Sequence, residues 1–303
     1  MRFVVTGCSG QLGACLVERL ATDADARCVG AYDHAGLDVA DPEAVRGIFD
    51  GLPGGPPDVL VNAAAFTAVD RCESEWECAL AVNGTGPGYL AEACRAVGTR
   101  LIHVSTDYVF AGEATTPYVE TTEVAPVTAY GRSKAEGERR VLETLPDALV
   151  VRTSWVFGPG WNFVAAILRQ ANLRRSGEVS GPLQVVDDQL GCPTYAADLA
   201  EGLIALSRAA SRSESVRGLY HLSNAGAITW WDFAREILDV SGFAALQIDR
   251  IKSDQLELPA RRPLYSVLDC ARAGALGIRL RDWKLALAAY LATPGGRALL
   301  DAV

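Results

Sequence analysis

Residues 1–13 read MRFVVTGCSGQLG: an apolar run over 2–6 ends at the first of three glycines, and a helical pattern over 12–20 follows. Glycines between a strand and a helix permit a tight turn and let an anionic pyrophosphate lie against the helix N-terminus. We therefore predict a dinucleotide-binding loop made by Gly7, Gly10, Gln11, Leu12 and Gly13.

Asp33 lies 20 residues after Gly13, at the end of the second predicted strand. An acidic residue in this place can bond the 2′-hydroxyl of an adenosine ribose and would repel a 2′-phosphate. Its neighbour His34 is mostly neutral at pH 7. Asp33 could equally cap its own loop, so the residues themselves leave both NADH and NADPH open.

The first 155 residues alternate apolar runs with helical patterns. Runs rich in Val, Ile and Leu predict strands over 2–6, 28–32, 59–62, 101–105 and 149–153. Helices are predicted over 12–20, 42–49, 75–97 in one or two pieces, and 129–145. Because the strands are apolar almost throughout, both faces of the sheet should be covered. This pattern predicts an α/β fold with a doubly wound, Rossmann-like parallel sheet.

Glycines and prolines punctuate the chain after residue 152, and the regular pattern loosens. Helices over 195–207, 230–240 and 283–291 and a strand over 218–222 remain readable. We expect a smaller C-terminal substrate-binding lobe. The dinucleotide-binding domain would comprise 1–155 plus roughly 183–225, and the lobe roughly 156–182 and 226–303.

Composition excludes several classes of protein. Half of the 303 residues are hydrophobic and 21% are charged, as in globular proteins. The net charge of −9 disfavours nucleic acid as a partner. No apolar stretch is long enough for a membrane helix and no signal peptide is recognisable, so we expect no membrane partner and a cytoplasmic location. The eight cysteines never form Cys-x-x-Cys and are expected as small buried hydrophobes.

A Tyr-x-x-x-Lys pair, Tyr130 and Lys134, falls on the helix predicted over 129–145. Residues four apart share one helix face, so both groups can address one bound molecule. The lysine charge is expected to lower the pKa of the tyrosine and make it a usable acid or base. Together with the glycine spacing, the pair resembles the extended branch of the short-chain dehydrogenase/reductase superfamily. That resemblance implies that Thr106, at the end of the strand over 101–105, orients a carbonyl oxygen; Ser105 is the nearest alternative.

Longer phrases narrow the resemblance. DVLVNAAAFTAVD over 58–70, RTSWVF over 152–157, DDQLGCPT over 187–194, GLYHL over 218–222 and Arg262-Pro263 are similar to the dTDP-4-dehydrorhamnose reductase family, in the right order. The family implies reduction of the C4 ketone of a dTDP-4-keto-6-deoxyhexose, with NADPH named first and NADH kept open. Alternatives are a 4-ketoreductase of a modified dTDP-deoxysugar and a non-catalytic NADP-binding regulatory subunit. An epimerase or dehydratase is disfavoured, because Asp107 after Thr106 is followed by Tyr108 rather than Glu.

The same resemblance implies further contact residues. Catalysis is expected from Thr106, Tyr130 and Lys134. Substrate contacts are expected from Thr106, Asp107, Tyr130, Trp155, Asn162, Phe163 and Arg262, with Trp155 as a wall for the sugar ring and Arg262 as a diphosphate donor. The cofactor set adds Asp38, Val39, Ala63, Ala64 and Ala65, besides Asp33, Tyr130 and Lys134.

No metal is expected. Asp187 and Asp188 are interpreted as structural, because adjacent residues of an extended strand point to opposite faces. Some family members form dimers around magnesium held by glutamates near the termini, but the final helix over 283–291 and the chain beyond Thr293 contain no Glu. We therefore expect a monomer or a weak homodimer.

Overall fold

A parallel sheet of six strands forms the centre of the larger domain in the computed structural model, which describes residues 1–301. The spatial order is β10-β5-β4-β3-β1-β2, and every neighbouring pair is parallel. The strands are β1 (Arg2–Thr6), β2 (Arg27–Tyr32), β3 (Val59–Asn62), β4 (Arg100–Thr106), β5 (Leu149–Thr153) and β10 (Gly218–His221). The order reverses between β1 and β3, and ligands of open α/β sheets bind at the carboxyl ends of such a pair.

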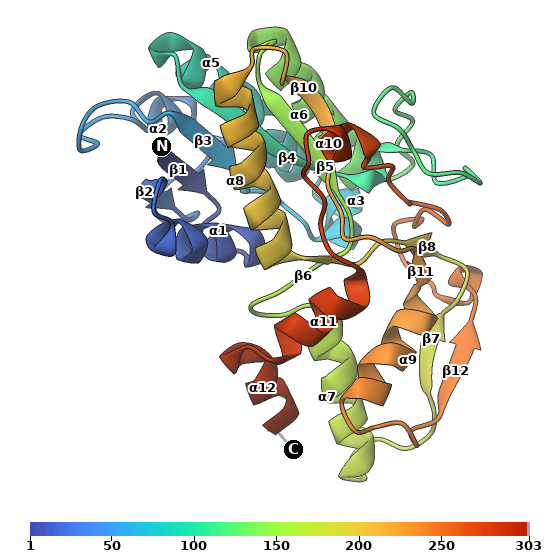
Figure 1. Ribbon diagram of the computed structural model, residues 1–303. Helices are drawn as coiled ribbons and strands as arrows, with labels where there is room; N and C mark the ends of the chain where they lie inside the picture. The colour runs from blue at the N-terminus through green and yellow to red at the C-terminus, as the bar shows by residue number, and fades with distance from the viewer. Residues whose placement is uncertain (302–303) are drawn as a thin grey trace.

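Helices cover both faces of this sheet (Figure 1). One face packs against α1 (Gln11–Thr22) and α8 (Ala196–Arg212), and the other against α2 (Pro42–Arg46), α5 (Gly86–Val97) and α6 (Ala129–Thr144). Successive residues of β1 serve opposite cores: Phe3 and Val5 face α1 and α8, whereas Val4 faces the other layer. The predicted doubly wound architecture is confirmed.

The helix predicted over 75–97 is instead several pieces. The chain forms α3 (Val69–Ser74), α4 (Trp76–Ala79) and a π-helical turn, η1 (Leu80–Thr85), before α5. Such π-helical turns are rare in proteins, and those that occur often lie at functional sites. Gly84 faces the backbone of α6, since a Cβ there would lie 3.4 Å from the carbonyl oxygen of Ser133.

The lobe lies to one side of the sheet, below it in Figure 1. Its short strands pair as β6 (Val156–Phe157) with β9 (Thr194–Tyr195), β7 (Leu183–Val186) with β12 (Ile248–Ile251), and β8 (Leu190–Gly191) with β11 (Ile228–Thr229). Its helices are α7 (Phe163–Arg175), α9 (Trp230–Val240), α11 (Trp283–Leu291) and α12 (Pro294–Asp301). They enclose a core of their own, rich in aromatic side chains such as Phe157 and Phe233.

The predicted domain boundaries need two corrections. The return to the larger domain, expected at about 183, comes only with α8, because β7 pairs with β12 inside the lobe. Conversely, α10 (Ala271–Ala275) lies in the segment assigned to the lobe, yet Ala273 and Ile278 join the core between the sheet and α8. Short 3-10 turns, η2 (Asp107–Val109) and η3 (Ser253–Gln255), complete the elements.

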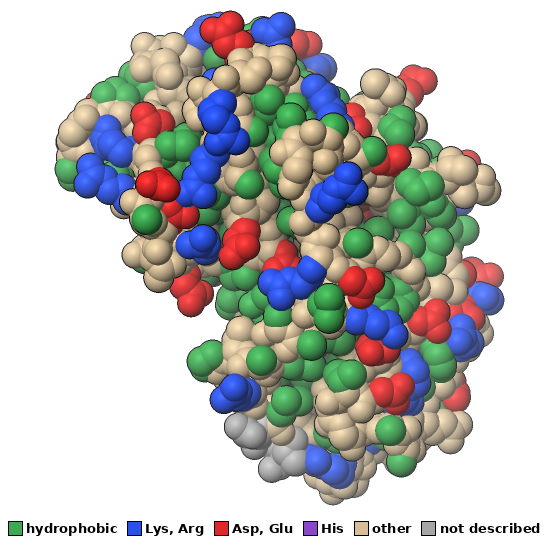
Figure 2. Space-filling model, in the orientation of Figure 1, with side chains coloured by type: hydrophobic (Ala, Val, Ile, Leu, Met, Phe, Trp, Pro, Cys, Tyr) green, Lys and Arg blue, Asp and Glu red, His purple; other side chains and the backbone are tan. Residues whose placement is uncertain are grey.

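Two surface properties bear on the class of protein. Of the helices within residues 1–301, none combines the length and apolarity needed to cross a membrane. Acidic and basic side chains are interspersed over the face seen in Figure 2.

All eight cysteines are free, and Cys15, Cys72, Cys94 and Cys192 are buried.

Candidate active site

The glycine loop after β1 is packed tightly against the end of β3. Gly7 has φ +71°, and a Cβ on it would lie 2.6 Å from the amide nitrogen of Ala64. A Cβ on Gly13 would lie 2.1 Å from the carbonyl oxygen of Gly7. Helix α1 begins at Gln11 without a side-chain cap, so its first N–H groups are available to an anion. These features fit a dinucleotide pyrophosphate at this turn.

The other predicted cofactor residues surround this loop. Asp33 directly follows β2, and its Oδ1 accepts the N–H of Gly36 at 3.0 Å, the loop-capping role that the sequence left open. Asp38 is exposed and caps Ala40 at 2.9 Å, and the next residue, Val39, is buried. The stretch Ala63–Ala65 follows β3, facing the glycine loop. Gln11 reaches toward the lobe, where its Nε2 donates to the carbonyl oxygen of Trp161 at 3.3 Å.

Thr106, Tyr130 and Lys134 meet at the carboxyl edge of the sheet. Thr106 ends β4, and its hydroxyl lies near the phenol of Tyr130. Lys134 is buried one turn further along α6 and donates from Nζ to the carbonyl oxygen of Val104 at 2.7 Å. The N-cap Thr128 starts α6 by accepting the N–H of Gly131 at 2.9 Å. The three groups predicted to be catalytic therefore come together from two adjacent elements.

Burial, rather than the lysine charge, dominates the titration of Tyr130. Desolvation raises the pKa of the phenol above its usual value, and the hydrogen bond with Thr106 only partly opposes this. The expected lowering by Lys134 is wrong for this arrangement, since its ammonium is directed to Val104. Desolvation also lowers the pKa of Lys134 to about 8, with Glu138 opposing it. Tyr130 is thus held protonated at neutral pH, as a proton donor must be.

Asp107 is buried directly beside these groups, with 2% of its surface exposed. Its Oδ1 accepts from the Thr106 hydroxyl at 2.9 Å. Desolvation raises the pKa of Asp107 to about 6, against the lowering effect of the hydroxyls of Ser266 and Thr106. Burial makes ionisation of this carboxyl unfavourable, and its hydrogen bond fixes the orientation of the Thr106 hydroxyl.

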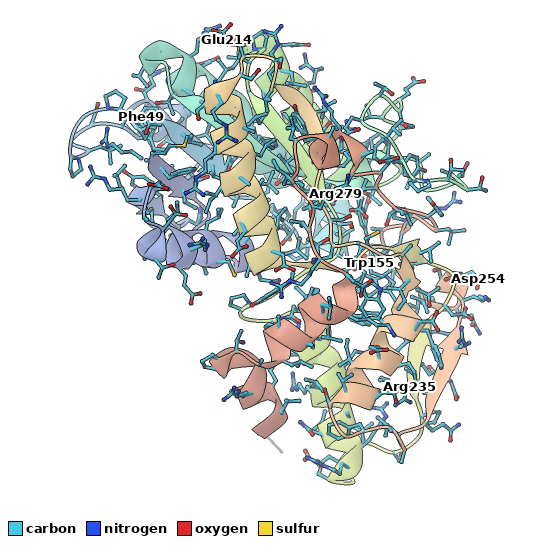
Figure 3. The ribbon with its side chains drawn as sticks, in the orientation of Figure 1. Phe49, Trp155, Glu214, Arg235, Asp254 and Arg279 are labelled. Carbon is cyan, nitrogen blue, oxygen red and sulfur yellow. The ribbon has the colours of Figure 1, made fainter. Side chains whose placement is uncertain are left out.

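Trp155 lies where the lobe meets the sheet (Figure 3). It has φ +44°, the one positive value of a non-glycine residue within residues 1–301. Its ring stacks on Trp230 with centroids 3.5 Å apart and planes 6° apart. Gly191 also abuts it, since a Cβ there would lie 2.4 Å from the Trp155 ring. With one face covered by Trp230, Trp155 can present to a sugar only its remaining surface.

Asn162 and Phe163 serve the lobe itself. Asn162 caps α7, accepting from Val164 and Ala165, and its amide donates to Gly158, Gly160 and Tyr290. Its amide is therefore engaged within the lobe, and the predicted substrate contact of this side chain stays a prediction. Phe163 packs against Trp230 with centroids 4.4 Å apart.

Arg262 forms a two-pronged ion pair with Asp70 of α3, at 2.5 and 2.6 Å. Its guanidinium also interacts with the Tyr108 phenol. The Tyr108 ring meets Tyr130 edge to face, with centroids 5.6 Å apart. Arg262 therefore lies near the site as predicted, but it is engaged with a carboxylate rather than free for a diphosphate.

Sequence reasoning missed Asn83, which lies fully buried in η1. Its amide group accepts from the N–H of Phe66 at 2.8 Å and donates to the hydroxyl of Ser133 at 3.1 Å, fixing α6. The run Asn83-Gly84-Thr85-Gly86-Pro87 was the available signal, because it interrupts a helical pattern. Asp187 and Asp188 are structural as expected: Asp187 pairs with Lys252 at 2.8 Å, and Asp188 accepts from Ser253.

Comparisons with known proteins agree with this geometry. Residues 1–294 match the family described as RmlD substrate binding domain. A dTDP-4-dehydrorhamnose reductase of Streptomyces griseus is 44% identical over 300 residues, which cover 98% of this chain and 95% of that protein. A probable dTDP-4,6-dihydroxy-2-methyloxan-3-one 4-ketoreductase of Streptomyces antibioticus is 41% identical, covering 95% and 93% of the two chains.

A solved structure shares the whole fold. The dTDP-4-dehydrorhamnose reductase of Bacillus anthracis, crystallised in complex with NADP, superposes with a TM-score of 0.84 at 31% identity. The match covers 96% of this chain and 98% of that one.

Replacing Gly13 by Ala should disrupt the loop, because the added Cβ would overlap the backbone of Gly7. We expect NADPH affinity to fall at least ~10-fold, on the scale of one lost charge-assisted contact. Titration of NADPH fluorescence measures this. Gly47→Ala, where a Cβ has its nearest neighbour at 3.5 Å, is the control. Unchanged affinity in Gly13→Ala would contradict the assignment of the loop.

Replacing Asp107 by Asn should stabilise the protein at neutral pH. Folding raises the pKa of Asp107 from 3.8 to about 6, so the folded state favours the protonated acid. The contribution of Asp107 to the free energy of unfolding is fully present below pH 3.8 and is lost as the pH rises through 6. The shift corresponds to roughly 3 kcal/mol at pH 8. We expect the Asn variant to exceed the wild type in unfolding free energy at pH 8 and to match it near pH 4. The exposed Asp254→Asn is the control; a gap that is the same at both pH values would contradict the burial argument.

Proposed function

The chain belongs to the RmlD substrate binding domain family, and we propose that it reduces the C4 ketone of a dTDP-4-keto-6-deoxyhexose with NADPH. The observation that carries this proposal is the convergence of Thr106, Tyr130 and Lys134 beside the glycine loop. A carbonyl at this edge of the sheet would meet the Thr106 hydroxyl, a protonated phenol and an ammonium group.

The residues have separate tasks in this reduction. Thr106 holds the ketone oxygen by turning its single hydroxyl hydrogen to that oxygen and away from Asp107, its acceptor when no substrate is bound. Tyr130 donates its proton to that oxygen as the oxygen becomes a hydroxyl. Lys134, whose ammonium donates to the carbonyl oxygen of Val104, would bond the nicotinamide ribose. The cofactor, when bound, supplies the hydride.

Two features of the chain support NADPH and a place in the cytoplasm. The turn of Gly7, Gly10 and Gly13 fits a pyrophosphate, and a relative at 31% identity was crystallised with NADP. Eight free cysteines suit a reducing compartment. We propose a monomer or a weak homodimer, tested by hydrodynamic mass at low concentration with and without a chelator.

The function is tested with enzymatically prepared dTDP-4-keto-6-deoxyhexoses, followed by the loss of NADPH absorbance. Turnover only in the presence of a 3,5-epimerase would identify the rhamnose-type substrate, and NMR of the product gives its C4 configuration. Turnover without the epimerase would identify a modified deoxysugar. Tight NADPH binding with no turnover on any of these sugars would refute the proposal in favour of a regulatory subunit.

Tyr130→Phe should lose at least ~10²-fold in kcat, the usual reach of acid catalysis, because the proton donor is gone. NADPH binding should stay close to that of the wild type. Tyr89→Phe, which removes a phenol oxygen from α5, is the matched control. Turnover near the wild-type rate in Tyr130→Phe would contradict the assignment of Tyr130 as the proton donor.

Asp33 offers a second test, on cofactor choice. Its carboxylate directly follows β2 near the glycine loop and would repel a 2′-phosphate. Asp33→Asn should therefore lower the KM for NADPH relative to that for NADH by roughly 5-fold, the effect of one exposed charge contact of about 1 kcal/mol. An unchanged ratio of the two KM values would place Asp33 away from the 2′ position and leave it as a loop cap.

A further inference from the structure

Glu138 is a buried carboxylate on the same face of α6 as Tyr130 and Lys134. It lies one turn after Lys134, with 4% of its surface exposed. It accepts from the Ser105 hydroxyl at 2.5 Å and from Nε and Nη2 of Arg152 at 2.8 and 2.6 Å. Three donors from β4 and β5 thus converge on one carboxylate directly beneath the proposed site.

Arg152 is buried as deeply, with 2% of its surface exposed. Its guanidinium lies 4.9 Å over the ring of Phe110, and Nη1 finds no hydrogen-bond partner within residues 1–301. Removing an ion pair from water usually costs as much as the attraction returns, and apolar residues of similar size stabilise a fold equally well. The cost of this pair points to a task other than stability.

The surroundings of Lys134 show what that task is. Burial lowers the pKa of the Lys134 ammonium, and the negative charge of Glu138 raises it. The neighbouring elements also bring charged groups of both signs, and α6 itself carries Arg132. The polar and titratable groups facing it or its helix are His103 and Ser105 on β4, Arg152 on β5, Asn83 on η1, Asp107 on η2, Glu73 and Asp70 on α3, and Glu136, Arg139 and Arg140 on α6 itself. His103 is fully buried and held neutral, since burial and the charge of Lys134 lower its pKa.

We propose that Glu138 is a positioning residue of the reduction: anchored by Arg152 and Ser105, its carboxylate fixes the reactive face of α6 against β4 and places a negative charge one turn from Lys134. The role rests on the proposed function of Tyr130 and Lys134. Loss of the carboxylate leaves Lys134 with burial alone, so its proton is released at lower pH. Without that proton Lys134 can no longer act as a charged donor to the cofactor ribose.

Glu138→Gln tests this with a side chain of the same shape. The alkaline limb of the kcat/KM profile should move by about one pH unit toward lower pH, the effect of removing one nearby charge from a buried site. The value of kcat at pH 8 should fall roughly 10-fold, while KM changes by less than about 2-fold, because the side chain does not reach the substrate. A merely structural role would lower the rate equally at every pH.

Two further variants guard the interpretation. Glu136→Gln removes a carboxylate from the solvent side of α6, where it pairs with Arg139 and Arg140, and should leave the limb in place. Glu138→Gln combined with Arg152→Met removes both buried charges and avoids an unpaired guanidinium, so it keeps the fold if the single variant fails to fold. The double variant should show the same shifted limb.

The pH dependence of NADPH binding gives a readout free of the sugar. Because Lys134 bonds the cofactor in the proposed mechanism, its earlier loss of charge should weaken binding at a lower pH in Glu138→Gln. If the wild type reduces none of the sugars, the proposed function fails, and this titration still decides the role of Glu138. An unmoved binding curve and an unmoved rate limb in folded variants would overturn the inference.

Discussion

The close seating of helix α6 on strands β4 and β5 is the constraint on which the site depends. Two glycines let α6 also approach the turns beside these strands: a Cβ on Gly131 would lie 2.1 Å from the carbonyl oxygen of Tyr108 in η2, and one on Gly137 would lie 2.2 Å from that of Asn83 in η1. Polar contacts then fix the rotation of the helix, through Ser105, Arg152 and Val104. A helix held this way delivers its phenol and ammonium groups to the end of β4 with little freedom to drift.

Charge is arranged around this contact at some energetic expense. Lys134, Glu138, Arg152 and Asp107 are all nearly sealed from water. Desolvation lowers the pKa of Lys134 to about 8 and raises that of Asp107 to about 6. Groups whose pKa values lie near the working pH exchange protons readily, and such perturbations gather at functional sites. Burial of these charged groups therefore lowers the stability of the fold and gives the site pKa values that suit proton transfer.

Much of this was predictable from local sequence. The strands β1 to β5 are apolar runs bounded by turn residues, and Tyr130 and Lys134 fall on one face of a helix that starts at a capping threonine. The features that sequence reasoning did not reveal depend on contacts between distant segments. Trp155 is covered by Trp230, which lies 75 positions later, and Arg262 is captured by Asp70. The raised pKa of Tyr130 likewise follows from enclosure, which spacing along a helix does not reveal.

The interleaving of the two layers has a consequence for synthesis. The chain passes from the sheet into β6 and α7, returns for α8 and β10, leaves for α9 and β12, comes back at α10, and ends in the lobe (Figure 1). Neither the sheet domain nor the lobe is one continuous segment of the chain. Each is therefore completed only when later segments have left the ribosome. The edge strand β10 and the covering helix α8 reach the sheet only after more than 190 residues have emerged. Before then the apolar face that α8 covers on β1 and β3 is open to solvent and to neighbouring nascent chains, so the greatest aggregation risk falls before α8 and β10 have emerged.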